Sequence, residues 1–239
     1  MKRLLAIETS SEACSVALAE GSNIHEQHAH APLKHAELLL ASVRTVLAQA
    51  GLRLTDLDAV VFGRGPGSFT SLRIGIGAVQ GLAWGAGLPV VPVSSLAAVA
   101  VQALDRGAEN IVVAMDARMD EVFTARFAVR EPVPAGTARS AAGTADLELL
   151  GAERVCDPAE IRVEPVAETI GCGNGFERYP ALRRLGVTLK EVRPDLLPRA
   201  SALIPLARTW LETQAPLPAQ EAQPVYVRDH VADKPARNA

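Results

Sequence analysis

A run of glycines between an apolar segment and a helix-forming segment constrains the fold of this chain more than any other feature. The run extends from Gly63 to Gly77, and the apolar residues 57–62 before it are predicted to form a buried strand. A strand, a glycine turn and a helix start leave several backbone N–H groups without partners at one point, which attracts anions. The loop has neither the Lys-Ser/Thr of a Walker loop nor dinucleotide-loop spacing. It therefore predicts an anion site of another kind.

The composition is that of an ordinary globular protein. Of the 239 residues, 49% are hydrophobic and 21% are charged, and 24 basic against 27 acidic side chains give a net charge of −3. This balance does not favour direct, high-affinity nucleic-acid binding. The charge is uneven: residues 177–208 carry seven Lys/Arg and three Asp/Glu, while residues 146–168 carry seven acids and two arginines. These segments are either solvated surfaces or a docking face.

The cysteine pattern and the N-terminus bear on the cellular compartment. Cys14, Cys156 and Cys172 lack metal-site spacing, and their odd number argues against a disulfide framework. The apolar run at the N-terminus is too short for a signal peptide, and Glu8 interrupts it. The chain contains no apolar stretch of ~20 residues that could span a membrane. We therefore expect a cytoplasmic protein.

Hydrophobic periodicity predicts an α/β protein of two lobes. Strands are expected over residues 4–7, 14–19, 24–30, 57–62 and 89–93, and helices over 33–50, 70–84 and from 95 to about 104. A strand pair over 111–115 and 121–129, a loop over 132–145, a strand and glycine turn over 168–175, helices over 176–185 and 198–211, and an extended tail should follow. The predicted domains are residues 1–99, residues 100–197, and a C-terminal helix and tail over 198–239 that packs back on the first lobe.

The helix predicted over residues 70–84 is apolar nearly all round. One stripe contains Leu72, Ile76, Val79 and Ala83, and a second contains the small residues Gly75, Ala78 and Gly81 with Ile74 and Leu82. A helix with two apolar faces is buried on two sides. We expect its own sheet on one side and either a second layer of this chain or a partner subunit on the other.

Four ordered motifs resemble a known family. The segments Leu5–Ser10 and Ser15–Leu18 are similar to the first phosphate-loop hairpin of the actin, sugar-kinase and Hsp70 superfamily. The segment Gly65–Gly75 looks like the hallmark of the TsaB (YeaZ) family, and Asp116–Val122 and Pro224–Arg228 match the same family in the same order. The motifs span nearly the whole chain.

The resemblance implies a two-lobed ribonuclease-H-like (actin-like ATPase) fold and a role in making N6-threonylcarbamoyladenosine in tRNA. In this pathway the paralogue TsaD transfers the threonylcarbamoyl group, with TsaB as heterodimer partner and the ATPase TsaE attached. The implied partners are therefore TsaD, TsaE, a second copy of this chain when TsaD is absent, and tRNA through the complex. No membrane partner is expected.

The resemblance also implies that this chain is not the catalyst. Ser95 and Val99 stand where TsaD has two metal-ligand histidines, and the late Asp-Asn pair of TsaD does not occur. We expect no catalytic residue, no metal and no required cofactor, with ATP or ADP bound weakly or at the complex interface. The alternative is a nucleotide-binding enzyme with weak ATPase or vestigial activity. Ser71 replaces the usual glycine of the family, which matters only if that position needs positive φ or close helix contact.

Two sets of site residues follow. The candidates for anion or nucleotide binding are Ser10, Ser11, Gly65, Gly67, Ser68, Thr70 and Asp116. The candidates for the partner interface, on the helices over 33–50 and 70–84, are Leu38, Leu72, Arg73, Ile76, Val79, Gln80 and Ala83. A charge at Ile76 or Val79 is expected to abolish association and to spare the fold.

Other chemistry-bearing residues leave alternatives open. His25, His28, His30 and His35 lie close in sequence and could hold a metal, although a solvated edge strand, with His35 at a helix start, explains them as well. Ser68 lacks the surroundings of a nucleophile. Asp116 is either a functional acid at a strand end or a cap of its own turn. Arg118 could face a partner, and Glu8 could be the relic of a catalytic acid.

Overall fold

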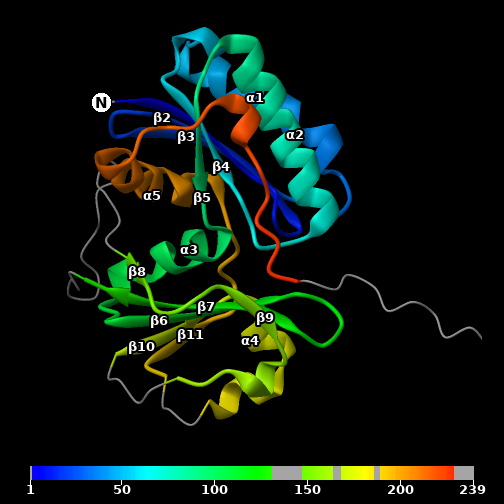
Figure 1. The fold of residues 1–239 in the computed structure, drawn as a ribbon, viewed down its shortest axis with the longest axis vertical. Coiled ribbons are helices and arrows are strands. Elements are labelled where there is room, and N and C mark those ends of the chain that lie inside the picture. Colours follow the sequence, from blue (N-terminus) through cyan, green and yellow to red (C-terminus); the bar gives the residue numbers. More distant parts are fainter. Residues whose placement is uncertain (1, 131–146, 164–167, 186–188, 229–239) are drawn as a thin grey trace, which may run out of the picture.

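The protein consists of two stacked β-sheets with helices between and around them. Figure 1 shows its computed structural model. The structure describes residues 2–130, 147–163, 168–185 and 189–228. The expected two-lobed α/β architecture is confirmed. The loop expected over 132–145 lies outside the described residues.

The first sheet has the order β3-β2-β1-β4-β5. Its strands are β1 (Arg3–Glu8), β2 (Ala13–Glu20), β3 (Asn23–His30), β4 (Ala59–Gly63) and β5 (Val90–Val93). The first three form an antiparallel meander, and β4 and β5 continue parallel to β1. This order is that of a ribonuclease-H-like lobe. β1 and β4 are apolar on both faces because both faces are covered, whereas the polar β3 is the edge strand.

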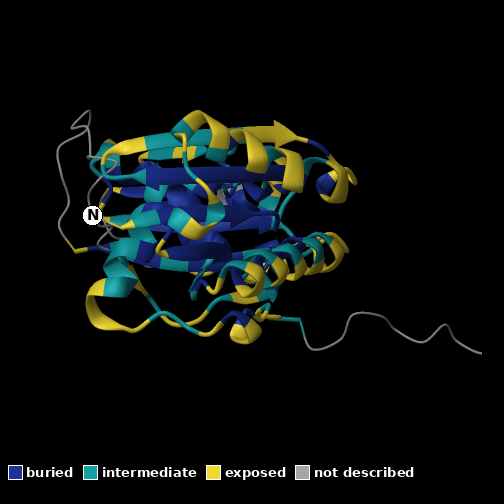
Figure 2. Ribbon diagram, turned by 90° about the horizontal axis from the view of Figure 1, so that it is seen from above, coloured by how far each residue is buried: buried dark blue, intermediate teal, exposed yellow. Residues whose placement is uncertain are grey.

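Helices cover both faces of the first sheet. α1 (His35–Ala50) and α2 (Phe69–Ala86) pack on one face, where their apolar residues join those of the strands in one core cluster. α5 (Ala200–Thr213) packs on the other face and contacts β1, β2, β4 and β5. The central strands of both sheets are buried, and the outward faces of the helices are exposed (Figure 2).

The second sheet has the order β11-β10-β6-β7-β8, with β9 paired to the same edge of β7 as β8. Its strands are β6 (Asn110–Asp116), β7 (Val122–Val129), β8 (Leu147–Leu149), β9 (Arg154–Cys156), β10 (Thr169–Cys172) and β11 (Glu191–Arg193). α3 (Ser95–Ala100) packs on the face toward the first lobe, and α4 (Gly175–Arg178) on the opposite face. α3 and α5 therefore lie between the two sheets (Figure 1).

Two predicted helices differ from the structure. The helix starting at Ser95 is α-helical only to Ala100 and continues as a 3₁₀ helix from Val101 to Arg106. The helix expected over 176–185 is divided into α4 and a 3₁₀ segment beginning at Pro180, because proline has no N–H to continue the helix. Within the described residues, no helix is both long and apolar enough to cross a membrane.

Candidate functional site

A cavity of about 560 Å³ lies between the two lobes. Its walls are the turn between β1 and β2, the glycine loop with the start of α2, the turn between β6 and β7, and residues 225–228. Six of the seven anion-site candidates line it, namely Ser10, Ser11, Gly67, Ser68, Thr70 and Asp116. Gly65 lies buried beneath them with φ +95°, a conformation that favours glycine.

The glycine loop fits directly against the turn between β1 and β2. The Ser68 N–H donates to the Ser10 carbonyl oxygen at 2.8 Å, and a Cβ added at Gly67 would collide with the same carbonyl. Glycine at position 67 therefore allows two backbones to meet. The Ser10 hydroxyl is buried at the cavity wall and finds no hydrogen-bond partner among the described residues.

The start of α2 points its first turn into the cavity. Ser68 is the N-cap, but its side chain does not bond a backbone N–H and instead lies 3.0 Å from the Ser71 hydroxyl. Ser71 is not among the residues with positive φ and is only half-buried, so serine replaces the family glycine without strain. The Ser71 carbonyl accepts a hydrogen bond from Thr9 at 2.9 Å, which ties the helix to the end of β1.

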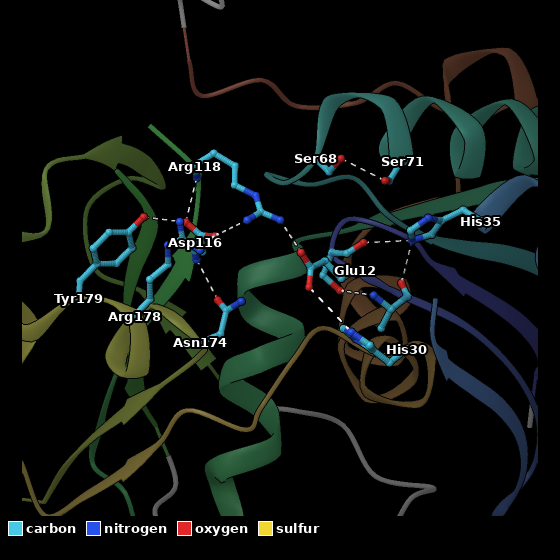
Figure 3. A network of polar contacts seen from close by, with 12 residues as sticks. Glu12, His30, His35, Ser68, Ser71, Asp116, Arg118, Asn174, Arg178 and Tyr179 are labelled. Atoms are coloured by element: carbon cyan, nitrogen blue, oxygen red, sulfur yellow. Dashed lines mark hydrogen bonds and ion pairs between the residues drawn. The ribbon is translucent and has the colours of Figure 1, made fainter. Parts of the chain in front are cut away.

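Asp116 is the centre of a polar network on the second lobe (Figure 3). Its carboxylate accepts hydrogen bonds from the Tyr179 hydroxyl at 2.7 Å and the Arg118 N–H at 3.0 Å, and Arg178 lies at 3.4 Å. Burial, together with the bond to Asp116, raises the pKa of Tyr179. The structure thus contains the turn cap that was one interpretation of Asp116, within the cavity wall.

A chain of charges crosses the cleft from this network. The Arg118 side chain extends from the second lobe to form an ion pair with Glu12 of the first, and Glu12 lies 4.0 Å from His30 (Figure 3). Arg118, Met119 and Asp120 all have positive φ, so the turn that carries this arginine is strained. Arg118, which we considered as a partner-facing residue, is bound across the cleft with 61% of its side chain exposed, so its contact with a partner stays a prediction.

The sequence did not indicate that the C-terminal residues would close the cavity. We call residues 224–228 the C-terminal strap. The Val225 N–H donates to the Arg64 carbonyl at 2.8 Å, and the Tyr226 hydroxyl accepts from Arg73 at 3.0 Å. Arg228 then pairs with Glu121 of the second lobe. The aromatic and basic residues of this motif were the available signal, but nothing local in the sequence indicates where they dock.

Glu8 and Ser95 meet in the core beside the site. Glu8 is fully buried; one carboxylate oxygen accepts the Ser10 N–H at 2.6 Å and the other accepts the Ser95 hydroxyl at 2.8 Å. Burial raises the pKa of Glu8 above its ordinary value of 4.5. Val99 is also fully buried. Positions 95 and 99 therefore belong to the packed interior rather than to an open site.

The histidines do not converge. His28 and His30 are exposed on the edge strand β3, whereas His35 is buried at the start of α1. The His35 Nε2 lies 3.0 Å from the Ser11 carbonyl and 3.3 Å from that of Ala13, so this nitrogen carries a proton and donates. In the described parts of the chain, no three His, Cys, Asp or Glu side chains are grouped as metal ligands.

The interface candidates on α2 require a correction. Leu72, Ile76, Val79 and Ala83 are buried in the core of the first lobe and have no surface for a partner. The expectation that a charge at Ile76 or Val79 would spare the fold is wrong for the same reason.

The three remaining interface candidates also make contacts within the chain. Arg73 holds the C-terminal strap, the Gln80 amide donates to the Ala222 carbonyl at 2.8 Å, and Leu38 packs partly against the same core. The outward face of α2 is formed instead by Gly77, Gly81, Trp84 and Gly85. Most of the second apolar stripe of α2 therefore packs against residues of the same chain, and Gly81 lies on the exposed face.

Comparisons with known proteins find a related family model, similar full-length proteins and a similar solved structure. A family model described as TsaD, tRNA N6-adenosine threonylcarbamoyltransferase, matches residues 22–150. The tRNA threonylcarbamoyladenosine biosynthesis protein TsaB of Haemophilus influenzae is 38% identical over 97% of this chain and 95% of its own. The protein of the same name from Escherichia coli is 36% identical over 97% of both chains. A solved structure of YeaZ from Pseudomonas aeruginosa, 37% identical, covers 95% of this chain and 100% of its own with a TM-score of 0.83.

Proposed function

The chain belongs to the TsaB (YeaZ) family of tRNA threonylcarbamoyladenosine biosynthesis proteins, and on that premise we propose that it is the non-catalytic subunit that partners and activates TsaD. The observation that carries this proposal is the identity to TsaB relatives along nearly the full length of the chain. The similarity therefore includes both lobes and the C-terminal strap rather than one shared domain.

The interior around Ser95 supports a non-catalytic role. A serine hydroxyl and a valine side chain replace the two histidines that the family resemblance places at these positions in TsaD. Both residues are fully buried, and the Ser95 hydroxyl is already bonded to Glu8. A metal-assisted transfer needs open ligand positions that substrate can reach. This part of the chain offers none, so the transfer belongs to the partner.

The outward face of α2 is the surface that we propose for TsaD, and for a second copy of this chain when TsaD is absent. Trp84 is 71% exposed, and Leu40 on the adjacent helix α1 is 51% exposed. A Cβ added at Gly77, Gly81 or Gly85 would meet nothing within 4 Å, so a partner helix could approach the backbone of α2 closely. TsaE and tRNA would then join through the complex.

The test is formation of the modified adenosine. Mass spectrometry would follow it in tRNA incubated with ATP, threonine, the donor synthase, TsaD and TsaE, with and without this protein. We expect product only in the complete mixture, and no turnover of ATP or of the threonylcarbamoyl donor by this protein alone. Equal product without it would contradict the proposal.

A second candidate function is nucleotide binding in the cleft, which the orphaned Ser10 hydroxyl beside the start of α2 favours. Against it stands Glu12, whose carboxylate lines the same cavity, pairs with Arg118 and would compete with phosphate groups for that guanidinium. Calorimetry with ATP and ADP in the presence of Mg²⁺ separates the two functions. Tight binding with turnover would favour an enzyme. If the protein is the non-catalytic subunit, we expect the wild type to bind nucleotide only weakly. We expect Glu12→Gln to bind nucleotide more tightly than the wild type.

A further inference from the structure

The outer face of the second sheet carries a separate pocket of about 460 Å³ that none of the preceding chemistry uses. It arises because β7 changes partner along one edge. Residues 122–124 pair with β9 and residues 127–129 pair with β8, which leaves Ala125 and Arg126 opposite a break. The segment between β8 and β9 passes over this break, and the Leu150 N–H donates to the Arg126 carbonyl at 2.8 Å.

Three arginines from three different segments line this pocket. Arg126 comes from β7, Arg154 from β9, and Arg162 follows the 3₁₀ turn at 158–160. Glu160 is the acidic residue among them. The surrounding segment 146–168 carries seven acids and two arginines, and both of those arginines face the pocket. The local charge of the pocket is thus opposite to that of the segment that forms it.

The three guanidinium groups have no carboxylate partner in the described chain. Arg126 is half-buried, and among the described residues its side chain has no hydrogen bond or ion pair. Arg162 donates to the Ala159 and Ile161 carbonyls, and Arg154 lies 3.5 Å from the Glu160 carbonyl. Carbonyl oxygens orient these two side chains but do not neutralise their charge. Nearby acids are engaged elsewhere: Asp157 caps its own turn, and Glu153 pairs with Arg64.

We propose that this arginine pocket binds a phosphate group. Guanidinium forks bind phosphate oxygens in pairs, and three forks supplied by three separate segments suit a tetrahedral anion with several oxygens better than a single carboxylate. The volume also accommodates a sugar attached to the phosphate. The phosphate can belong to a small phosphorylated molecule or to the backbone of an RNA. The site does not depend on the proposed role in the TsaD complex.

The first experiment is an NMR titration of the full-length, ¹⁵N-labelled protein with inorganic phosphate and with AMP at constant ionic strength. Amide shifts are expected at residues 124–126, 150–154 and 160–163. Arg126→Gln removes a guanidinium that has no bonded partner among the described residues, so the fold should persist. Phosphate affinity should fall about tenfold or more, because a charged hydrogen bond to phosphate is lost. Arg130→Gln, the same charge change just beyond β7, is the matched control and should bind as the wild type does. Shifts confined to other residues, or equal affinity in Arg126→Gln, would overturn the site.

A second experiment identifies the source of the phosphate. In the reconstituted complex, tRNA affinity is measured as a function of salt concentration for the wild type, Arg126→Gln and Arg130→Gln. If the phosphate is that of RNA, Arg126→Gln weakens tRNA binding and reduces the salt slope by about one phosphate contact. If phosphate binding is lost while tRNA binding is unchanged, the ligand is a small phosphorylated molecule. Neither result depends on whether TsaD requires this protein for activity.

Discussion

At the scale of single residues, the buried carboxyl group of Glu8 couples folding to pH. Burial raises its pKa above the ordinary value of 4.5, so between that value and the folded-state pKa the folded state holds a proton that the unfolded state releases. The contribution of Glu8 to the free energy of unfolding is therefore fully present below about pH 4.5, and it is lost as the pH rises through the folded-state pKa. We expect Glu8→Gln, which is uncharged at every pH, to lose less stability than the wild type over that rise. Urea unfolding of both proteins from pH 4 to 9 measures the free energy of unfolding at each pH. If it falls equally with pH in both proteins, Glu8 is not the cause of the loss.

Two glycines of α2 provide a matched test of packing. A Cβ at Gly75 would collide with the Thr9 hydroxyl, whereas a Cβ at Gly77 would meet nothing. Gly75→Ala should therefore destabilise the fold by about 1–3 kcal/mol, and Gly77→Ala should stabilise it by about 0.5–1 kcal/mol through helix propensity. Chemical denaturation gives both values. Adding Thr9→Ser should not relieve Gly75→Ala, because the hydroxyl remains, but Thr9→Ala should.

At this scale the sequence predicted positions better than it predicted contacts. Gly67 and Ser68 were placed at an anion-attracting loop, and the structure brings them to the cavity with Ser10 and Asp116. The bond between Glu8 and Ser95 was not predictable, because it joins two residues 87 positions apart in the chain. A residue type shows that a polar group needs a partner, but only the fold determines which partner it finds.

At the scale of elements, α2 illustrates a limit of hydrophobic patterning. Its sequence is apolar nearly all round, so periodicity predicted burial on two sides but could not distinguish core from interface. The deciding contacts come from residues after 215, where Ala219 and Ala222 join the core beside α2. The structure leaves Trp84 as the large apolar residue on the outward face.

We accordingly expect Trp84→Glu to weaken association with TsaD, or self-association, at least about tenfold while leaving the free energy of unfolding within about 0.5 kcal/mol. Sedimentation velocity and calorimetry with TsaD measure the association. Ile76→Glu is the contrasting variant, because its side chain is buried and a charge there should unfold the protein. Unchanged affinity in a folded Trp84→Glu protein would place the interface elsewhere.

At the scale of the whole molecule, the cleft is held by contacts that join the lobes. Arg118 pairs with Glu12, and Glu153 of the second lobe lies 2.9 Å from Arg64 of the first. The C-terminal strap adds a third connection between the first turn of α2 and the turn between β6 and β7. The general two-lobed architecture could be predicted from strand and helix patterns. The closure of the cleft could not, because it depends on ion pairs between distant segments.

The strap connection should control how easily the cleft opens. Replacing both Tyr226 and Arg228 by alanine removes the bond to Arg73, the stacking on Phe69 at 5.3 Å between ring centroids, and the ion pair with Glu121. Each lobe keeps its own core, so the strands should keep their protection. We expect faster amide hydrogen exchange in residues 116–122 and in the first turn of α2, with β1 and β4 unchanged. Val192→Ala, an exposed change on β11 away from the cleft, is the control. If exchange in both cleft turns equals that of the wild type, the other contacts between the lobes keep the cleft closed, and the strap does not control its opening.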